Sequence, residues 1–127
     1  MYFLRAKNYL SKLETFGDFP IIKNTLPDES ESLIQASKRA PRYKVAHFIL
    51  EDLDQAISLL TNNISGGKNR ITKNAALLLK SRAALFEASW LTYHKGTALV
   101  PGGPGWPGKA EDIADFNICL LSTSDAA

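Results

Sequence analysis

The spacing of apolar residues along the chain predicts helices and no strands. Apolar positions recur every three or four residues from about Phe3 to Phe16, from Tyr43 to Leu60 and from Lys73 to His94, which is the repeat of one helix face. The capping-box pattern of Asp28–Glu31 predicts a further short helix over about Glu29 to Ser37. No alternating run rich in Val, Ile or Thr reaches the length of a strand. The expected fold class is therefore all-α.

Capping and helix-breaking residues agree with these limits. Gly17 suits a left-handed C-terminal cap for the first helix, and Thr72 suits an N-cap for the helix that follows it. Gly66 and Gly67 mark the turn that we expect to join the second and third long helices into a hairpin. Seven of the eight residues from Pro101 to Gly108 are Pro or Gly, so this segment forms neither a helix nor a central strand.

The predicted helix from Lys73 to His94 is apolar on nearly all sides. Its polar stripe is narrow and consists of Lys73, Lys80 and Glu87, spaced seven residues apart. A helix of this kind must be buried on several sides, and two flanking helices barely supply that cover. We therefore expect stacked helical hairpins, with Leu79 fully buried between them.

Composition places the chain among ordinary folded domains. A length of 127 residues corresponds to one domain, and 45% hydrophobic residues exclude disorder as the default. The net charge of +2 does not indicate a nucleic-acid partner. The longest apolar run, Ala75 to Leu79, is far too short to span a bilayer, and the single cysteine, Cys119, can close no internal disulfide.

The charged and nucleophilic residues match no catalytic or metal-binding pattern. Gly67-Lys68 lacks the rest of a phosphate-binding loop, and His47 and His94 stand outside any zinc-binding spacing. We interpret the acidic residues within 51–54 as a solvated helix face. A basic cluster is interpreted as a solvated loop leading into a helix, and its members are Lys38, Arg39, Arg42 and Lys44. No enzyme activity, metal or cofactor is expected.

Several short motifs follow one another in an order that resembles a known family. They are, in chain order, Arg5-Ala6 with Tyr9 and Leu13, then Phe16-Gly-Asp-Phe-Pro20, Ala40-Pro-Arg42, Phe48 to Ile57, Gly67 to Glu87, and Tyr93-His-Lys-Gly96 with the Pro/Gly-rich segment. From about Phe3 to Gly108 this succession resembles the SusD/RagB family of Bacteroidetes outer-membrane lipoproteins.

The resemblance implies both a fold and a function. Members of the family are built on tetratricopeptide-like helical hairpins and have no catalytic activity of their own. They bind nutrients, mostly glycans, at the cell surface and deliver oligosaccharides to a TonB-dependent transporter of the SusC type. A second interpretation stays open, in which the chain is a helical-repeat module for protein–protein interaction without sugar binding.

The resemblance also sets expectations for the extent of the chain. Family members are several times longer and begin with a lipidated cysteine, so a lipid anchor would lie outside this sequence. We interpret residues 1–116 as a fragment of a SusD/RagB-like helical domain. Residues 117–127 no longer resemble the family, and we interpret them as a non-native tail.

Trp106 is the residue that we expect to contact a sugar. It lies in Pro104-Gly-Trp-Pro107, where the prolines stiffen the loop and the glycines leave the indole uncrowded. Aromatic faces suit the apolar C–H faces of sugar rings, and a rigid loop lowers the ordering cost of binding. The alternative, a packing role for Trp106 in the helical stack, is the commoner fate of a large aromatic residue. Trp90 and Tyr93 are weaker candidates, because they lie on the crowded third long helix.

Overall fold

The computed structural model describes residues 1–63 and 70–116, and these residues form an all-α fold. Its helices are α1 (Tyr2–Phe16), α2 (Ser30–Ala36), α3 (Arg42–Leu59), α4 (Lys73–Tyr93) and α5 (Ala110–Asp115). Within the described ranges no strand is present, and Phe19 and Ala40 form one isolated antiparallel bridge. The predicted fold class is confirmed, and each predicted helix lies within one residue of its expected limits.

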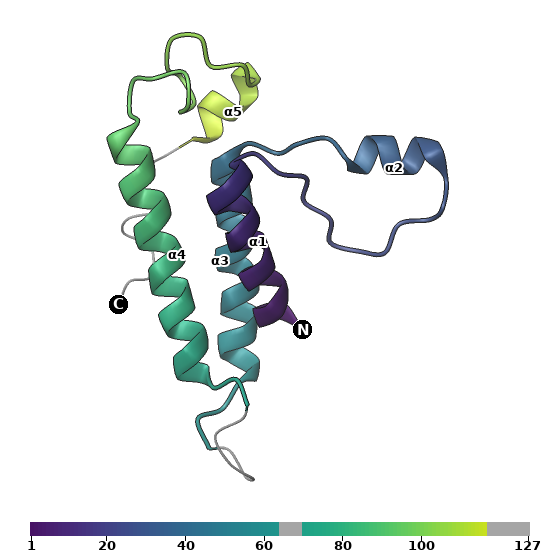
Figure 1. Ribbon diagram of the computed structural model, residues 1–127, viewed down its shortest axis with the longest axis vertical. Coiled ribbons are helices and arrows are strands. Elements are labelled where there is room, and N and C mark those ends of the chain that lie inside the picture. The colour runs from purple at the N-terminus through teal and green to yellow at the C-terminus, as the bar shows by residue number, and fades with distance from the viewer. Residues whose placement is uncertain (64–69, 117–127) are drawn as a thin grey trace.

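Helices α1, α3 and α4 run side by side along the long axis of the molecule, while α2 stands out on an arm (Figure 1). Arg42 at the start of α3 pairs with Glu87 late in α4, and Asp54 near the end of α3 pairs with Lys80 earlier in α4. The two helices are therefore antiparallel, as the hairpin interpretation requires. The expected turn at Gly66 and Gly67 lies outside the described residues.

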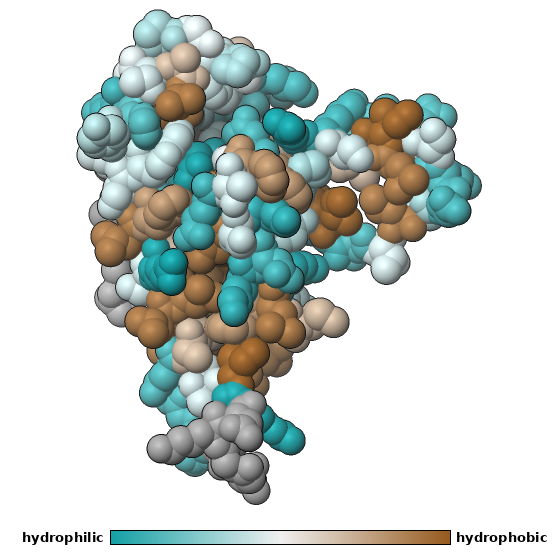
Figure 2. Space-filling model, viewed as in Figure 1, coloured by the Kyte–Doolittle hydropathy of each residue, from teal (hydrophilic) through white to brown (hydrophobic). Residues whose placement is uncertain are grey.

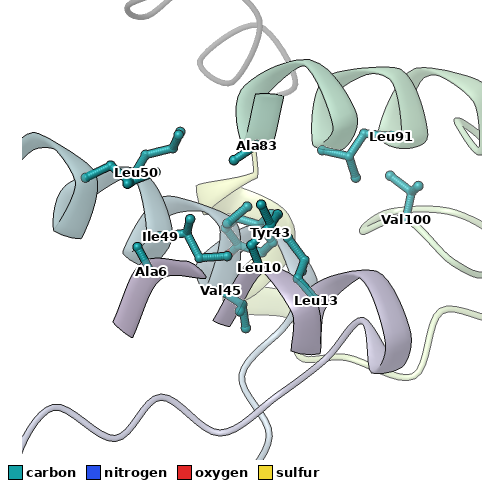
Figure 3. Packing of buried hydrophobic residues seen from close by; sticks show 12 residues of the cluster. Ala6, Leu10, Leu13, Tyr43, Val45, Ile49, Leu50, Ala83, Leu91 and Val100 are labelled. Atoms are coloured by element: carbon teal, nitrogen blue, oxygen red, sulfur yellow. The ribbon is translucent and has the colours of Figure 1, made fainter. Parts of the chain in front are cut away.

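The hydrophobic core lies where α3 packs between α1 and α4. Its fully buried side chains include Leu13 of α1, Val45, Ile49 and Leu53 of α3, and Leu91 of α4. Figure 3 shows side chains of all three helices in this cluster, together with a residue from the loop after α4. Each such aliphatic side chain stabilises the fold by about 1.5–3 kcal/mol relative to an exposed one.

Two of the three residues of the polar stripe of α4 face the interior, whereas Lys73 is exposed and an apolar side of the helix faces outward. Lys80 and Glu87 are buried against α3, whereas Leu78 and Leu85 are 73% and 70% exposed. Figure 2 shows hydrophobic side chains at the surface over the long helices and on the α2 arm. The expectation that two flanking helices barely supply the cover that α4 needs is thus confirmed for the described residues.

The prediction that Leu79 is fully buried is wrong. Leu79 is half-buried and packs against the rim of the core, whereas Ala76 and Ala83 are fully buried. The reason is geometric. Small side chains at i and i+7 let α4 approach α3 closely, so the closest line of contact passes through the alanines and the polar stripe rather than through Leu79.

Of the three helix caps that the sequence predicts, one is formed as expected and two are not. Thr72 caps α4, since its Oγ1 accepts a hydrogen bond from the Ala75 amide at 3.1 Å. Gly17 has the expected positive φ of 72°, but its ψ of −100° is not that of a left-handed cap. The N-cap of α2 is Glu29 without a side-chain hydrogen bond, so the capping box of Asp28–Glu31 is not formed.

No helix in the described ranges has the combination of length and hydropathy that crossing a bilayer demands.

Candidate functional site

The Pro/Gly-rich segment after α4 folds into a succession of hydrogen-bonded turns. The amides of Thr97, Val100, Gly103 and Trp106 each donate to the carbonyl three residues earlier, at N–O distances of 3.0, 3.3, 3.0 and 3.2 Å. The first of these carbonyls belongs to His94 at the end of α4. Trp106 is therefore connected to α4 through four consecutive turns, which fix its backbone relative to the helix.

The sequence explains why the chain turns at these points. Gly96, Gly102 and Gly105 occupy the third position of three turns, and their φ angles of 79°, 82° and 81° are open to glycine at low cost. Pro101 and Pro104 occupy the second position of two of these turns, where the φ preferred by proline is the one required. The Pro101-Gly102 and Pro104-Gly105 pairs thus favour a turn at each of these two points of the loop.

The Trp106 indole is half-buried and rests on the loop itself. A Cβ atom added to Gly108 would overlap three carbon atoms of the indole ring. The absence of a side chain at Gly108 therefore leaves the space that the indole ring occupies. The indole also lines a recess together with Pro107.

This recess lies where α1 and α4 end and α3 begins. Figure 1 shows these three helix ends at the same end of the molecule. It has a volume of about 400 Å³. Its walls come from residues 14–18, from Arg39 in the segment before α3, from Arg42 at the start of α3, from Trp90 of α4, and from the loop at residues 98–99 and 106–107. The recess thus brings together residues from the end of α1, the start of α3, α4 and the loop after α4, and Trp106 is one of them.

The Arg42 side chain is one of those that line the recess, and it is 9% exposed. Its Nε donates to both carboxylate oxygens of Glu87 at 3.0 and 2.8 Å, and its Nη1 donates to the Leu13 carbonyl at 3.2 Å. Its Cζ lies 3.9 Å from the ring centroid of Trp90, which is a cation–π contact. Its Nη2 is buried and has no hydrogen-bond partner in the part of the chain that the structure describes. A buried donor without a partner costs about 1–3 kcal/mol.

Charges around Arg42 come from three segments. Burial raises the pKa of Glu87, and the neighbouring Arg42 opposes part of that increase. Asp18 accepts a hydrogen bond from the Arg42 backbone amide at 2.8 Å through its Oδ1. Pro41, at the N-cap position of α3, forms no side-chain hydrogen bond. Asp18 therefore takes the place of a capping residue, since it accepts from one of the amides at the start of the helix that have no partner within it.

The interpretation of the charged clusters as solvated is wrong for two of their residues. Arg42 is buried against Glu87, and Asp52 is buried with both oxygens accepting from Arg5 at 2.6 and 2.7 Å. Lys44 is 40% exposed, and its Nζ lies 2.6 Å from Asp112 Oδ1. Each of these side chains has a partner at least 45 residues away in the sequence. The spacing of neighbouring residues therefore could not predict these ion pairs. Lys38 and Arg39 are exposed, as expected.

The other aromatic and metal-binding candidates lie apart from Trp106 or serve packing. Trp90 is half-buried beneath Arg42, and its ring centroid is 4.4 Å from that of His94. Tyr93 is 85% exposed and lies outside the recess. His47 contacts the Tyr43 ring edge-on. Across residues 1–63 and 70–116 no three His, Cys, Asp or Glu side chains are grouped as metal ligands would be.

A second concave feature follows the outward face of α4. It has a volume of about 850 Å³ and is lined mainly by apolar side chains, with Leu78, Leu85 and Tyr93 among them. Glu14 of α1 contributes to one wall. This groove has the character of a packing surface rather than of a site with directed polar groups.

Comparison with known proteins adds evidence from outside the chain. Neither the family models nor the curated proteins that were searched gave a match. Among solved structures, the crystal structure of a SusD-like protein from Bacteroides fragilis NCTC 9343 matches 70% of this chain with a TM-score of 0.61 and 32% sequence identity. The chain is SusD-like. It covers 17% of the length of that relative.

The match confirms the resemblance expected from the order of the motifs and, with it, the partial SusD-like helical fold. It does not extend to the interpretation of residues 117–127 as a non-native tail, because those residues lie outside the described part of the chain. The role of Trp106 likewise stays a prediction, now attached to a defined recess.

Proposed function

We propose that this chain is a region of a surface-exposed outer-membrane lipoprotein that binds glycans and passes oligosaccharides to a SusC-like TonB-dependent transporter. The observation that carries the proposal is the match to a SusD-like protein at 32% identity over 70% of the chain. The lipid anchor, the transporter partner and the sugar ligand are parts of this proposal. So is the absence of catalysis, since the proposed task is to bind and hand over an unmodified glycan.

The recess under Trp106 supports a binding role through the kinds of groups that line it. An indole offers an apolar face to the C–H face of a sugar ring, and the nearby Arg39, Asp18 and Glu14 offer donors and acceptors to hydroxyl groups. The four turns that hold the loop reduce the entropy lost when the indole is fixed by a ligand.

The test is a set of calorimetric titrations of the intact protein with oligosaccharides of defined composition, namely α-glucan, β-glucan, fructan and galacturonan. We expect at least one series to bind, and we expect Trp106→Ala to weaken that binding with little change in melting temperature. Tyr93→Ala is the matched control, because Tyr93 is an exposed aromatic residue outside the recess. A lower melting temperature with unchanged affinity would identify Trp106 as a packing residue instead.

A second candidate function is a helical-repeat module for protein–protein interaction without sugar binding. The observation that favours it is the apolar groove along α4, where Leu78 and Leu85 are largely exposed. Stacked helical hairpins bury such faces against the next hairpin or against another protein. This function predicts that no oligosaccharide binds, while substitutions in the groove impair assembly.

A further inference from the structure

We propose that Asp112 is a positioning residue for the recess that contains Trp106. By bonding to Tyr43 and Lys44 of α3, it anchors the far end of the loop that carries the indole. Asp112 does not line the recess itself, so it would act on a glycan only through the order of that loop. This inference rests on the proposed glycan-binding function and names a residue that controls the order of its site.

Asp112 bonds to two consecutive residues at the start of α3. Its Oδ1 accepts from Lys44 Nζ at 2.6 Å, and its backbone carbonyl accepts from the Tyr43 hydroxyl at 3.1 Å. Asp112 and Tyr43 are both buried, whereas the Lys44 side chain is 40% exposed. The hydrogen bond to Asp112 raises the pKa of Lys44, so the ammonium is charged at neutral pH. A bond between two charged groups is stronger than a bond between neutral ones.

The attachment of α5 to the rest of the molecule depends on these bonds. A helix of six residues is not stable by itself, and Asp112 is the only residue of α5 that is buried. Phe116, directly after α5, adds an edge-on ring contact with Tyr43 at a centroid distance of 5.4 Å. Figure 1 shows α5 beside the loop, at the end of the molecule where α3 begins. The anchor of α5 is therefore a polar one, centred on Asp112.

The connection from α5 back to Trp106 is short. Only residues 107–109 separate Trp106 from α5, and the Asp112 amide donates to the carbonyl of Lys109, the N-cap residue, at 3.1 Å. A Cβ atom added to Gly102 would lie 3.6 Å from Cγ2 of Ile113, so α5 also contacts a turn in the middle of the loop. A displacement of α5 would therefore reach the loop at two places.

With Asp112 in place, the loop is fixed at both of its ends. The turn that begins at His94 fixes the first end to α4, and Asp112 fixes the second end to α3. A chain segment that is held at both ends has fewer conformations than a segment held at one. A ligand that orders such a loop loses less entropy on binding, and this is the contribution to affinity that we assign to Asp112.

The first measurement is amide hydrogen exchange by NMR on the intact protein, without any sugar. In Asp112→Ala we expect the protection of the Gly103 and Trp106 amides to fall about tenfold, because a charge-assisted, partly exposed bond is lost. Amides around Leu10 in the middle of α1 should keep their protection, since α1 lies in the hydrophobic core away from the loop. A residue that merely stabilised the whole fold would alter both sets of amides.

Three further variants show whether the ion pair is responsible. Lys44→Met removes the other partner of the bond and should loosen the loop as Asp112→Ala does. Lys44→Arg keeps a charged donor opposite Asp112 and should retain most of the protection. Asp115→Ala is the matched control, because it makes the same change on the same helix at a side chain that is 66% exposed and 3.9 Å from Lys44. Its loop amides should exchange as in the wild type.

The second measurement is the affinity for the α-glucan, β-glucan, fructan or galacturonan oligosaccharide that binds the wild type in calorimetry. Binding weakens in proportion to the fraction of molecules in which the loop stays ordered. We expect a loss of about threefold in Asp112→Ala and in Lys44→Met, and none in Asp115→Ala.

The outcomes separate this inference from the function on which it rests. Unchanged exchange in the loop of Asp112→Ala, or faster exchange throughout α1 as well, would overturn the inference. So would a loosened loop that binds the oligosaccharide as tightly as the wild type, and glycan binding would then stand without a role for Asp112. If no oligosaccharide bound to the wild type, the proposed function would fail, and the positioning role would fail with it whatever the exchange showed.

Discussion

Arg42 in the first turn of α3 and Glu87 in α4 form a buried ion pair, with Nε 2.8 Å from Oε2 and side chains that are 9% and 1% exposed. The pair lies at one end of the hairpin, next to the α1 carbonyl of Leu13 and the ring of Trp90. The pair therefore connects the three long helices, and its Arg42 also lines the recess that contains Trp106.

Removing one member of this pair should destabilise the fold strongly. Glu87→Ala leaves the Arg42 charge buried without a counter-ion, and such changes cost about 3–5 kcal/mol. The free energy of unfolding in urea measures the loss. The double variant Arg42→Met with Glu87→Leu should lose less than Glu87→Ala alone, because no uncompensated charge remains. Glu51→Ala, an exposed acid on α3, is the control. Equal stability of Glu87→Ala and wild type would contradict a buried pair.

Leu79 and Leu53 should differ in their contribution to stability. Leu53 is fully buried in α3, so Leu53→Ala is expected to cost about 2–5 kcal/mol. Leu79 is half-buried on α4, so Leu79→Ala should cost roughly half as much, since less apolar surface is lost from the interior. Chemical denaturation of both variants gives the comparison. A larger loss for Leu79→Ala would restore the sequence-based prediction that this residue lies at the centre of the interface.

The isolated 127-residue chain should be weakly stable and should self-associate. Leu78 and Leu85 on α4 are more than two-thirds exposed, and an apolar groove runs beside them. Exposed apolar faces of this size favour association. Sedimentation velocity at increasing concentration should show larger species, and the double variant Leu78→Glu with Leu85→Lys should reduce them without loss of helical circular dichroism. A wild-type monomer with a sharp cooperative melt would count against this prediction.

Gly108 should be required for the position of the Trp106 indole. A Cβ at residue 108 would overlap the ring, so Gly108→Ala should displace the indole and cost about 1 kcal/mol. Near-ultraviolet circular dichroism reports the displacement, and a thermal melt reports the cost. In a Trp106→Ala background the same substitution should have almost no effect, because the overlapping ring is absent. An unchanged spectrum in Gly108→Ala would show that the indole lies elsewhere.

Local features of the sequence were sufficient to predict helices α1 to α4 and the loop after α4, but not the short helix α5. The repeat of apolar residues gave the limits of the long helices to within one residue, and Thr72 was recognised as a cap. The prolines and glycines of residues 101–108 specified a turn-forming loop. These features succeed because a helical repeat, a cap and a turn each depend on residues a few positions apart. The ordered motifs also led to the SusD-like family, which the structural match confirms.

Tertiary structure decided which face of each helix is buried and where the charged residues find partners. On α4 nearly every face is apolar, so the repeat could not show that Lys80 and Glu87 point inward and Leu78 outward. That orientation depends on Asp54 and Arg42, which lie on another helix. The recess combines Trp106 with side chains from three other segments, and no spacing within one segment encodes such a meeting. Local sequence fixes the elements, whereas the buried charges and the site depend on contacts between residues far apart in the chain.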